Sequence, residues 1–171
     1  KALRNELARC LENPGRFTLM YLRTLDIHGF KCFGEPFTID FHDGLNVLVG
    51  ENGAGKTGVI AAVRQLFNDS ESGKRLINER DFHRGFHEAA VAAQRIDIRA
   101  TFSDLDENDA IAFRDWCCNE EEAKLTFTAL NLESRGRFKS QLYGGYARAT
   151  ALETETLDLI HCIYLPPLRD A

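Results

Sequence analysis

The chain has 171 residues, a formal net charge of −5 and 44% hydrophobic residues, which is typical of one globular domain with a sizeable core. The acidic balance argues against a nonspecific cationic coat for nucleic acid, although it leaves room for a local basic patch. Five cysteines without C-x-x-C spacing favour free, mostly buried thiols, and the lack of a membrane-length apolar run or a signal-peptide pattern predicts a cytoplasmic protein with no membrane partner.

Residues 1–19 carry apolar side chains at helical spacing and stop at Asn13-Pro14-Gly15, so we expect at most a short amphipathic helix there. Met20 is the only methionine, and a strand pattern begins at it. A natural start at Met20, with 1–19 as a leader or added segment, therefore stands beside the alternative that 1–19 is native.

Alternating apolar residues predict two strands, over 21–27 and 37–41, joined by a turn from Gly29 to Gly34. Because both strands precede the motif described next, we expect a small antiparallel β subdomain beside a mixed sheet with flanking helices. The fold class predicted is α/β.

Residues 45–62 combine a buried-strand pattern at 45–49, a glycine-rich turn and the start of a helix over 57–67. The turn is a P-loop, Gly50-x-x-x-x-Gly55-Lys56-Thr57, whose glycines let successive N–H groups point at one phosphate chain. Lys56 is expected on the β- and γ-phosphates, and the Thr57 hydroxyl on Mg²⁺. The predicted ATP-binding residues are Gly50, Glu51, Asn52, Gly53, Ala54, Gly55, Lys56, Thr57 and Gly58.

The position of the P-loop excludes several classes of nucleotide-binding protein. Small metabolite kinases carry it on their first strand, so that class survives only if the two early strands are misassigned. Guanine-nucleotide switch proteins need an Asn-Lys-x-Asp motif, which the sequence lacks.

Three polar clusters have a functional and a structural interpretation. The charges of 68–84 alternate in sign, which favours a solvated connector over a DNA patch. The acids of 104–109 precede a helical run over 110–117, so helix capping is favoured over a metal site. His83 and His87 have one-turn spacing, but structural histidines are favoured over zinc ligands because no further ligands are obvious.

The second half predicts a strand over 95–102, a hairpin over 124–143 and a central parallel strand over 157–165. Residues 134–150 hold four basic side chains and no acid, which makes them the best candidate for contact with a nucleic-acid backbone, against the commoner polar hairpin tip. These side chains are Arg135, Arg137, Lys139 and Arg148.

Cys117 and Cys118 are adjacent and precede three glutamates. We expect the acids to raise the pKa of these thiols, which predicts inert rather than redox-active cysteines.

Together these motifs make the chain from Met20 to Ala171 resemble the N-terminal part of ABC-type ATPases of the RecF/SMC class, and most closely the OLD (overcoming lysogenisation defect) family of ATP-dependent nucleases. The residues that carry the resemblance are Leu25-x-Ile27-x-Gly29-Phe30-Lys31-x-Phe33, Ile39-x-Phe41, the stretch 45–57, Asp81-Phe82-His83 and 164–171. The resemblance implies that Lys31 lies near the nucleotide and touches it. It also implies DNA as a partner of the full-length protein and a homodimer formed through the ATPase heads.

The sequence departs from that class at Gly58, where a hydroxyl or larger residue is usual. Glycine there should weaken the helix start by about 1 kcal/mol without removing the phosphate cradle.

Several parts of a complete ATPase of this class are absent from the sequence: a Walker B acid pair, an ABC signature, a His switch and a Toprim nuclease domain. Residues 142–146 imitate the signature and 157–165 a Walker B strand, but Pro166-Pro167 stands where the acids belong. We therefore expect 20–171 to be the N-terminal lobe of an ATPase domain, with no catalytic residues of its own. The leading hypothesis is an OLD-like ATP-dependent endonuclease in DNA repair or phage defence. The alternative is an SMC/RecF-like scaffold head without nuclease activity.

Overall fold

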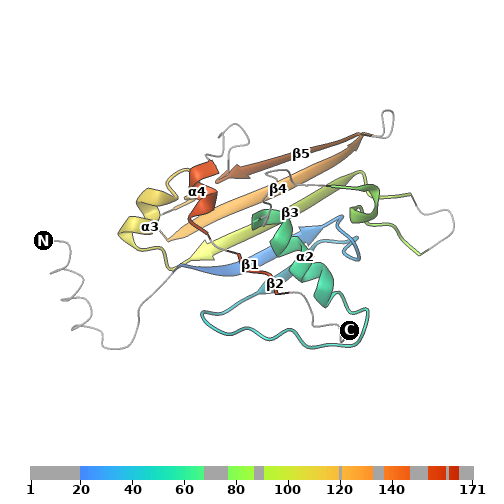
Figure 1. The fold of residues 1–171 in the computed structure, drawn as a ribbon, viewed down its shortest axis with the longest axis horizontal. Coiled ribbons are helices and arrows are strands. Elements are labelled where there is room, and N and C mark those ends of the chain that lie inside the picture. The colour runs from blue at the N-terminus through green and yellow to red at the C-terminus, as the bar shows by residue number, and fades with distance from the viewer. Residues whose placement is uncertain are drawn as a thin grey trace, which may run out of the picture.

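The computed structural model describes residues 20–67, 77–86, 91–119, 121–132, 137–146, 154–160 and 162–165. The expected helix within 1–19 and the hairpin tip at 133–136 lie outside these ranges. Within them, five strands form one antiparallel sheet in the order β2-β1-β3-β4-β5 (Figure 1). Its strands are β1 (Tyr21–His28), β2 (Phe37–Asp40), β3 (Arg95–Ser103), β4 (Glu122–Leu132) and β5 (Arg137–Gly144).

The register of the sheet follows from the alternation of apolar and polar residues. On β3, Ile96 and Ile98 are fully buried while Arg95 and Arg99 are exposed, because successive side chains of a strand point to opposite faces. Ile98 pairs with Phe127 of β4, which adds a second buried side chain to the same face. The two early strands, the β3 strand and the β4–β5 hairpin are thus confirmed.

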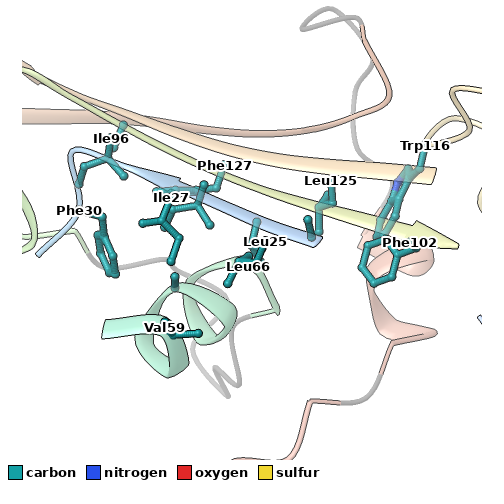
Figure 2. Close-up of a cluster of buried hydrophobic side chains, with 14 of the residues drawn as sticks. Leu25, Ile27, Phe30, Val59, Leu66, Ile96, Phe102, Trp116, Leu125 and Phe127 are labelled. Atoms are coloured by element: carbon teal, nitrogen blue, oxygen red, sulfur yellow. The ribbon is translucent and has the colours of Figure 1, made fainter. Parts of the chain in front are cut away.

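The inner face of the sheet packs on helix α2 (Lys56–Phe67). Figure 2 shows Leu66 of this helix pointing toward Leu25 of β1, and Val59 belongs to the same cluster of buried side chains as Ile27. All four are nearly inaccessible to solvent, since a helix and a sheet are stable only when each covers the apolar face of the other. The predicted helix after the P-loop is confirmed. Among the described residues, no helix combines the length and apolar character needed to cross a membrane.

A second helix, α3 (Glu107–Ala112), lies at one end of the sheet (Figure 1). The side chain of Asp106 accepts a hydrogen bond from the N–H of Asp109, and the side chain of Asp109 accepts one from the N–H of Asp106. This reciprocal pair is a capping box, so the capping interpretation of the acidic cluster is confirmed. The imitation signature ends β5: a Cβ on Gly144 would clash with the buried Trp116 ring, which explains the glycine.

Two predicted strands are wrong. Residues 45–49 form no strand, and the side chains of Leu45, Val47 and Val49 are 90%, 71% and 85% exposed. Residues 157–165 overlap a short helix, α4 (Thr154–Asp158), and 162–165 again form no strand. A strand exists only where a neighbour completes its ladder, and the five-stranded sheet does not include either segment. The α/β fold with an antiparallel β subdomain is confirmed nonetheless.

Replacing Leu66 by alanine should lower the free energy of unfolding by about 2–5 kcal/mol, because it leaves a cavity under the sheet. Ile60 of the same helix is 43% exposed, so Ile60→Ala is the matched control and should cost far less. Urea unfolding followed by circular dichroism measures both; equal losses would show that α2 does not pack as described.

Candidate nucleotide-binding site

The P-loop residues 50–55 lead directly into α2, which begins at Lys56. Gly53 and Gly55 have φ angles of 88° and 95°, a region of backbone conformation that side chains disfavour. Among the described residues, the N–H groups of Gly53 and Gly55 donate to no partner, whereas that of Ala54 donates to the carbonyl of Glu51. The loop therefore offers free amides at the positive end of a helix dipole, which suits an anion.

The side chain of Lys56 folds back across the same loop. Its Nζ donates to the carbonyl oxygens of Gly50 and Glu51 at 2.6 Å and 2.7 Å. These contacts hold the ammonium against the backbone of the loop, and its third N–H has no acceptor among the described residues. Thr57, the next residue of α2, is exposed.

The turn between β1 and β2 packs against the start of α2. A Cβ placed on Gly58 would lie 2.9 Å from Cε2 of Phe33 and 3.3 Å from Sγ of Cys32. The Phe33 ring also stacks on Phe37 at 4.9 Å between centroids, which limits its movement. Gly58 is buried, and the turn leaves no room for a side chain there. The departure at Gly58 thus has a packing reason that sequence reasoning missed.

Lys31 lies in this turn with a φ angle of 49°. Its Nζ is 2.9 Å from Oδ1 of Asp81, and its N–H donates to the Asp81 carbonyl at 2.8 Å. Asp81 is the last residue of a short 3-10 helix, η1 (Glu79–Asp81). The structure thus brings the Lys31 turn to the start of the P-loop helix, and contact between Lys31 and a nucleotide stays a prediction.

His83 joins the same turn to the segment after η1. Its Nδ1 lies 2.8 Å from the carbonyl of Lys31, and its N–H donates to the carbonyl of Gly29 at 2.9 Å. The ring fills the space beside Gly34. His83 therefore has a structural role, while His87 lies outside the described residues. In the part of the chain that the structure describes, no three His, Cys, Asp or Glu side chains form a metal site.

The basic stretch is only partly visible. Lys139 is exposed on β5, whereas Arg135 and Arg148 lie outside the described residues, so the structure does not assemble this patch. Of the charged residues in the connector 68–84, the structure describes Glu79, Arg80, Asp81 and Arg84. Asp81 is buried rather than solvated.

The described cysteines, Cys32, Cys117, Cys118 and Cys162, are free, as expected. They are less buried than expected, since Cys32 is exposed and the others are partly exposed. Burial, followed by the neighbouring Cys118, raises the pKa of the Cys117 thiol above its ordinary value. The predicted direction is confirmed for Cys117, where burial and not a glutamate is the largest cause.

Replacing Gly58 by alanine should leave stability unchanged or lower it, although alanine favours a helix by about 1 kcal/mol over glycine. The reason is the Phe33 ring at the Cβ position. In a Phe33→Ala background the same change should stabilise the chain. Thermal unfolding of the wild type, the two single variants and the double variant measures these changes. If Gly58→Ala raised stability in both backgrounds, the packing of Phe33 on Gly58 would be contradicted.

Alkylation of Cys117 by iodoacetamide should require a higher pH than alkylation of an ordinary thiol, because the raised pKa delays formation of the thiolate. In the Cys118→Ser variant, the pKa of Cys117 should stay raised for the most part, since burial is the largest cause of the shift. Mass spectrometry of labelled peptides over a pH series gives the profile. A Cys117 profile that returns to the ordinary thiol range in Cys118→Ser would contradict the assignment to burial.

A family model described as an AAA ATPase domain matches residues 20–153. The chromosome partition protein Smc of Halothermothrix orenii is 38% identical over 61 residues, which are 36% of this chain and 5% of that protein. That of Fusobacterium nucleatum is 48% identical over 44 residues, 26% of this chain and 4% of that protein. The matched part of the chain thus corresponds to a small fraction of the length of these relatives.

Solved structures show the same fold. A structure described as part of the structural biochemistry of ATP-driven dimerization and DNA-stimulated activation of SMC ATPases has a TM-score of 0.53 and 22% identity, over 81% of this chain and 76% of that chain. The Smc head domain with a coiled coil from Pyrococcus yayanosii has a TM-score of 0.55 and 23% identity, over 82% and 25%. These likenesses show that the chain shares the fold of these head domains. Since the family model covers most of the sequence, the chain belongs to the AAA ATPase domain family.

Proposed function

We propose that this chain is the ATP-binding lobe of an SMC-like ATPase head, and that it holds ATP and Mg²⁺ on residues 50–58. The observation that carries the proposal is the P-loop at the start of α2. Within the described residues, the amides of Gly53 and Gly55 have no acceptor, and the ammonium of Lys56 lies against the same loop. An ammonium and convergent backbone N–H groups are the donors that a phosphate chain requires.

The residues present fit both parts of the ligand. Lys56 would turn its ammonium from the Gly50 and Glu51 carbonyls toward the phosphates, or share it with them. The exposed hydroxyl of Thr57 is an oxygen ligand of the kind that Mg²⁺ prefers. Bound Mg²⁺ would neutralise part of the phosphate charge.

We also propose that residues 20–171 form one lobe of a larger ATPase domain. Ile163 and Leu165 are 84% and 82% exposed while Cys162 and Tyr164 are partly buried, which is the alternation of a strand without a neighbour. The apolar side chains of Leu45, Val47 and Val49 are likewise exposed. Strands from a further part of the protein would cover both segments and would bring the acids that activate water.

An SMC-like head fits better than the OLD-like nuclease, because chromosome partition proteins Smc are among the relatives of this chain. By analogy with the structure described for ATP-driven dimerization and DNA-stimulated activation, we propose a cytoplasmic protein whose heads form an ATP-dependent homodimer that responds to DNA. An endonuclease role in DNA repair or phage defence rests on the sequence resemblance alone.

Calorimetry with ATP and Mg²⁺ on the wild type and on Lys56→Ala tests the P-loop assignment. Lys56→Ala should weaken binding at least about tenfold, since a hydrogen bond to a charged group contributes about 1.5–3 kcal/mol. Lys139→Ala removes the same charge from an exposed position on β5 and should change little.

Equal affinity of the wild type and Lys56→Ala would refute the site. The 171-residue chain alone should bind ATP weakly and hydrolyse almost none, because the acids of the catalytic step are proposed to lie elsewhere. Robust turnover by this chain would refute the proposal that it is one lobe of a site.

A further inference from the structure

The ammonium of Lys31 has a single ionic partner among the described residues. Its Nζ donates to Oδ1 of Asp81 at 2.9 Å and lies 5.2 Å from the centre of the Phe30 ring. The Lys31 side chain is 37% exposed, whereas that of Asp81 is only 11% exposed. An ammonium has three N–H groups, so two of them remain for another acceptor.

Asp81 is itself held in place. Its Oδ2 accepts the N–H of Asn78 at 3.0 Å, which closes the capping box of η1, and its carbonyl accepts the N–H of Lys31. A carboxylate this buried is costly unless it stays paired. The ion pair between Asp81 and Lys31 is therefore expected to persist when a ligand binds.

The turn that carries Lys31 touches the phosphate loop. Sγ of Cys32, the next residue, lies 3.3 Å from the point where a Cβ of Gly55 would stand, and the Phe33 ring lies 3.2 Å from it. Gly55 belongs to the P-loop, so the two residues that follow Lys31 pack directly against the proposed phosphate site.

We propose that Asp81 is a positioning residue of the nucleotide site. By holding one N–H of Lys31, it orients the ammonium so that the other two face a bound phosphate chain. The inference rests on the proposed function and adds to it, because it gives the segment after the P-loop helix a part in nucleotide affinity that acts through Lys31.

A double-mutant cycle in the full-length protein tests the positioning, with calorimetry of a nonhydrolysable ATP analogue and Mg²⁺ as the readout. Asp81→Asn keeps a carbonyl oxygen for the Asn78 amide but turns an NH₂ group toward Lys31, so the tether is lost while the cap remains. Lys31→Ala removes the ammonium. Each variant should weaken binding about threefold to tenfold, and the double variant no more than either one.

Each other outcome overturns the proposal. Tighter binding by Asp81→Asn would make Asp81 a competitor of the phosphate, and unchanged binding would leave it no part in the site. If Asp81→Asn lowered nucleotide affinity equally in the wild-type and Lys31→Ala backgrounds, its effect would be purely structural. If Asp81→Asn does not fold, as judged by thermal unfolding, Asp81→Ser takes its place in the cycle, since serine also carries a side-chain oxygen acceptor of the kind that caps a helix.

Two controls separate this inference from the proposed function. Asp97→Asn breaks the pair between Asp97 and Arg95 on the sheet and should leave affinity unchanged. Lys56→Ala tests the P-loop itself. Loss of binding in Lys56→Ala with wild-type binding in Asp81→Asn would refute only the positioning role, whereas wild-type binding in Lys56→Ala would refute the site.

Discussion

The close approach of Phe33 to Gly58 is the contact on which the rest of the site depends. The sheet buries its inner face against α2 at Val59 and Leu66, and this nonspecific packing would tolerate small shifts of the helix. A ring pressed onto a residue without a side chain does not, because there is no gap to absorb a displacement. The P-loop is therefore held at a defined place relative to β1 and β2.

The charges at the site combine several positive groups with one buried carboxylate. The free amides of Gly53 and Gly55 and the ammonium of Lys56 gather positive charge at one end of α2. The buried carboxylate of Asp81 lies close by and balances Lys31. Cationic side chains that lie close together repel one another, whereas the fixed carboxylate of Asp81 attracts the Lys31 ammonium and so sets its orientation.

The exposed apolar segments support the proposal that the chain is one lobe of a larger domain. In the described chain, 45–49 and 162–165 show apolar side chains to solvent although their sequence favours burial. The first of them leads into the P-loop, so a neighbour that covered it would also stiffen the loop. Nucleotide affinity and completion of the domain are expected to be linked for this reason.

Local rules in the sequence determined much of this protein. The alternation in β1, β3 and the β4–β5 hairpin predicted the antiparallel strands, the acids around Asp106 predicted a capped helix, and the spacing of the P-loop predicted its place before α2. These features need only near neighbours, or a partner that follows in the chain.

The tertiary structure alone decided the rest. Residues 45–49 have the pattern of a buried strand, but a strand forms only where another segment completes its hydrogen bonds. Gly58 departs from the expected pattern because Phe33, distant in the sequence, occupies the space above it. Likewise Lys31 and Asp81 are 50 residues apart, and only the fold brings the ammonium to its carboxylate. Local residue spacing does not predict contacts of this kind, because they depend on where the sheet places each turn.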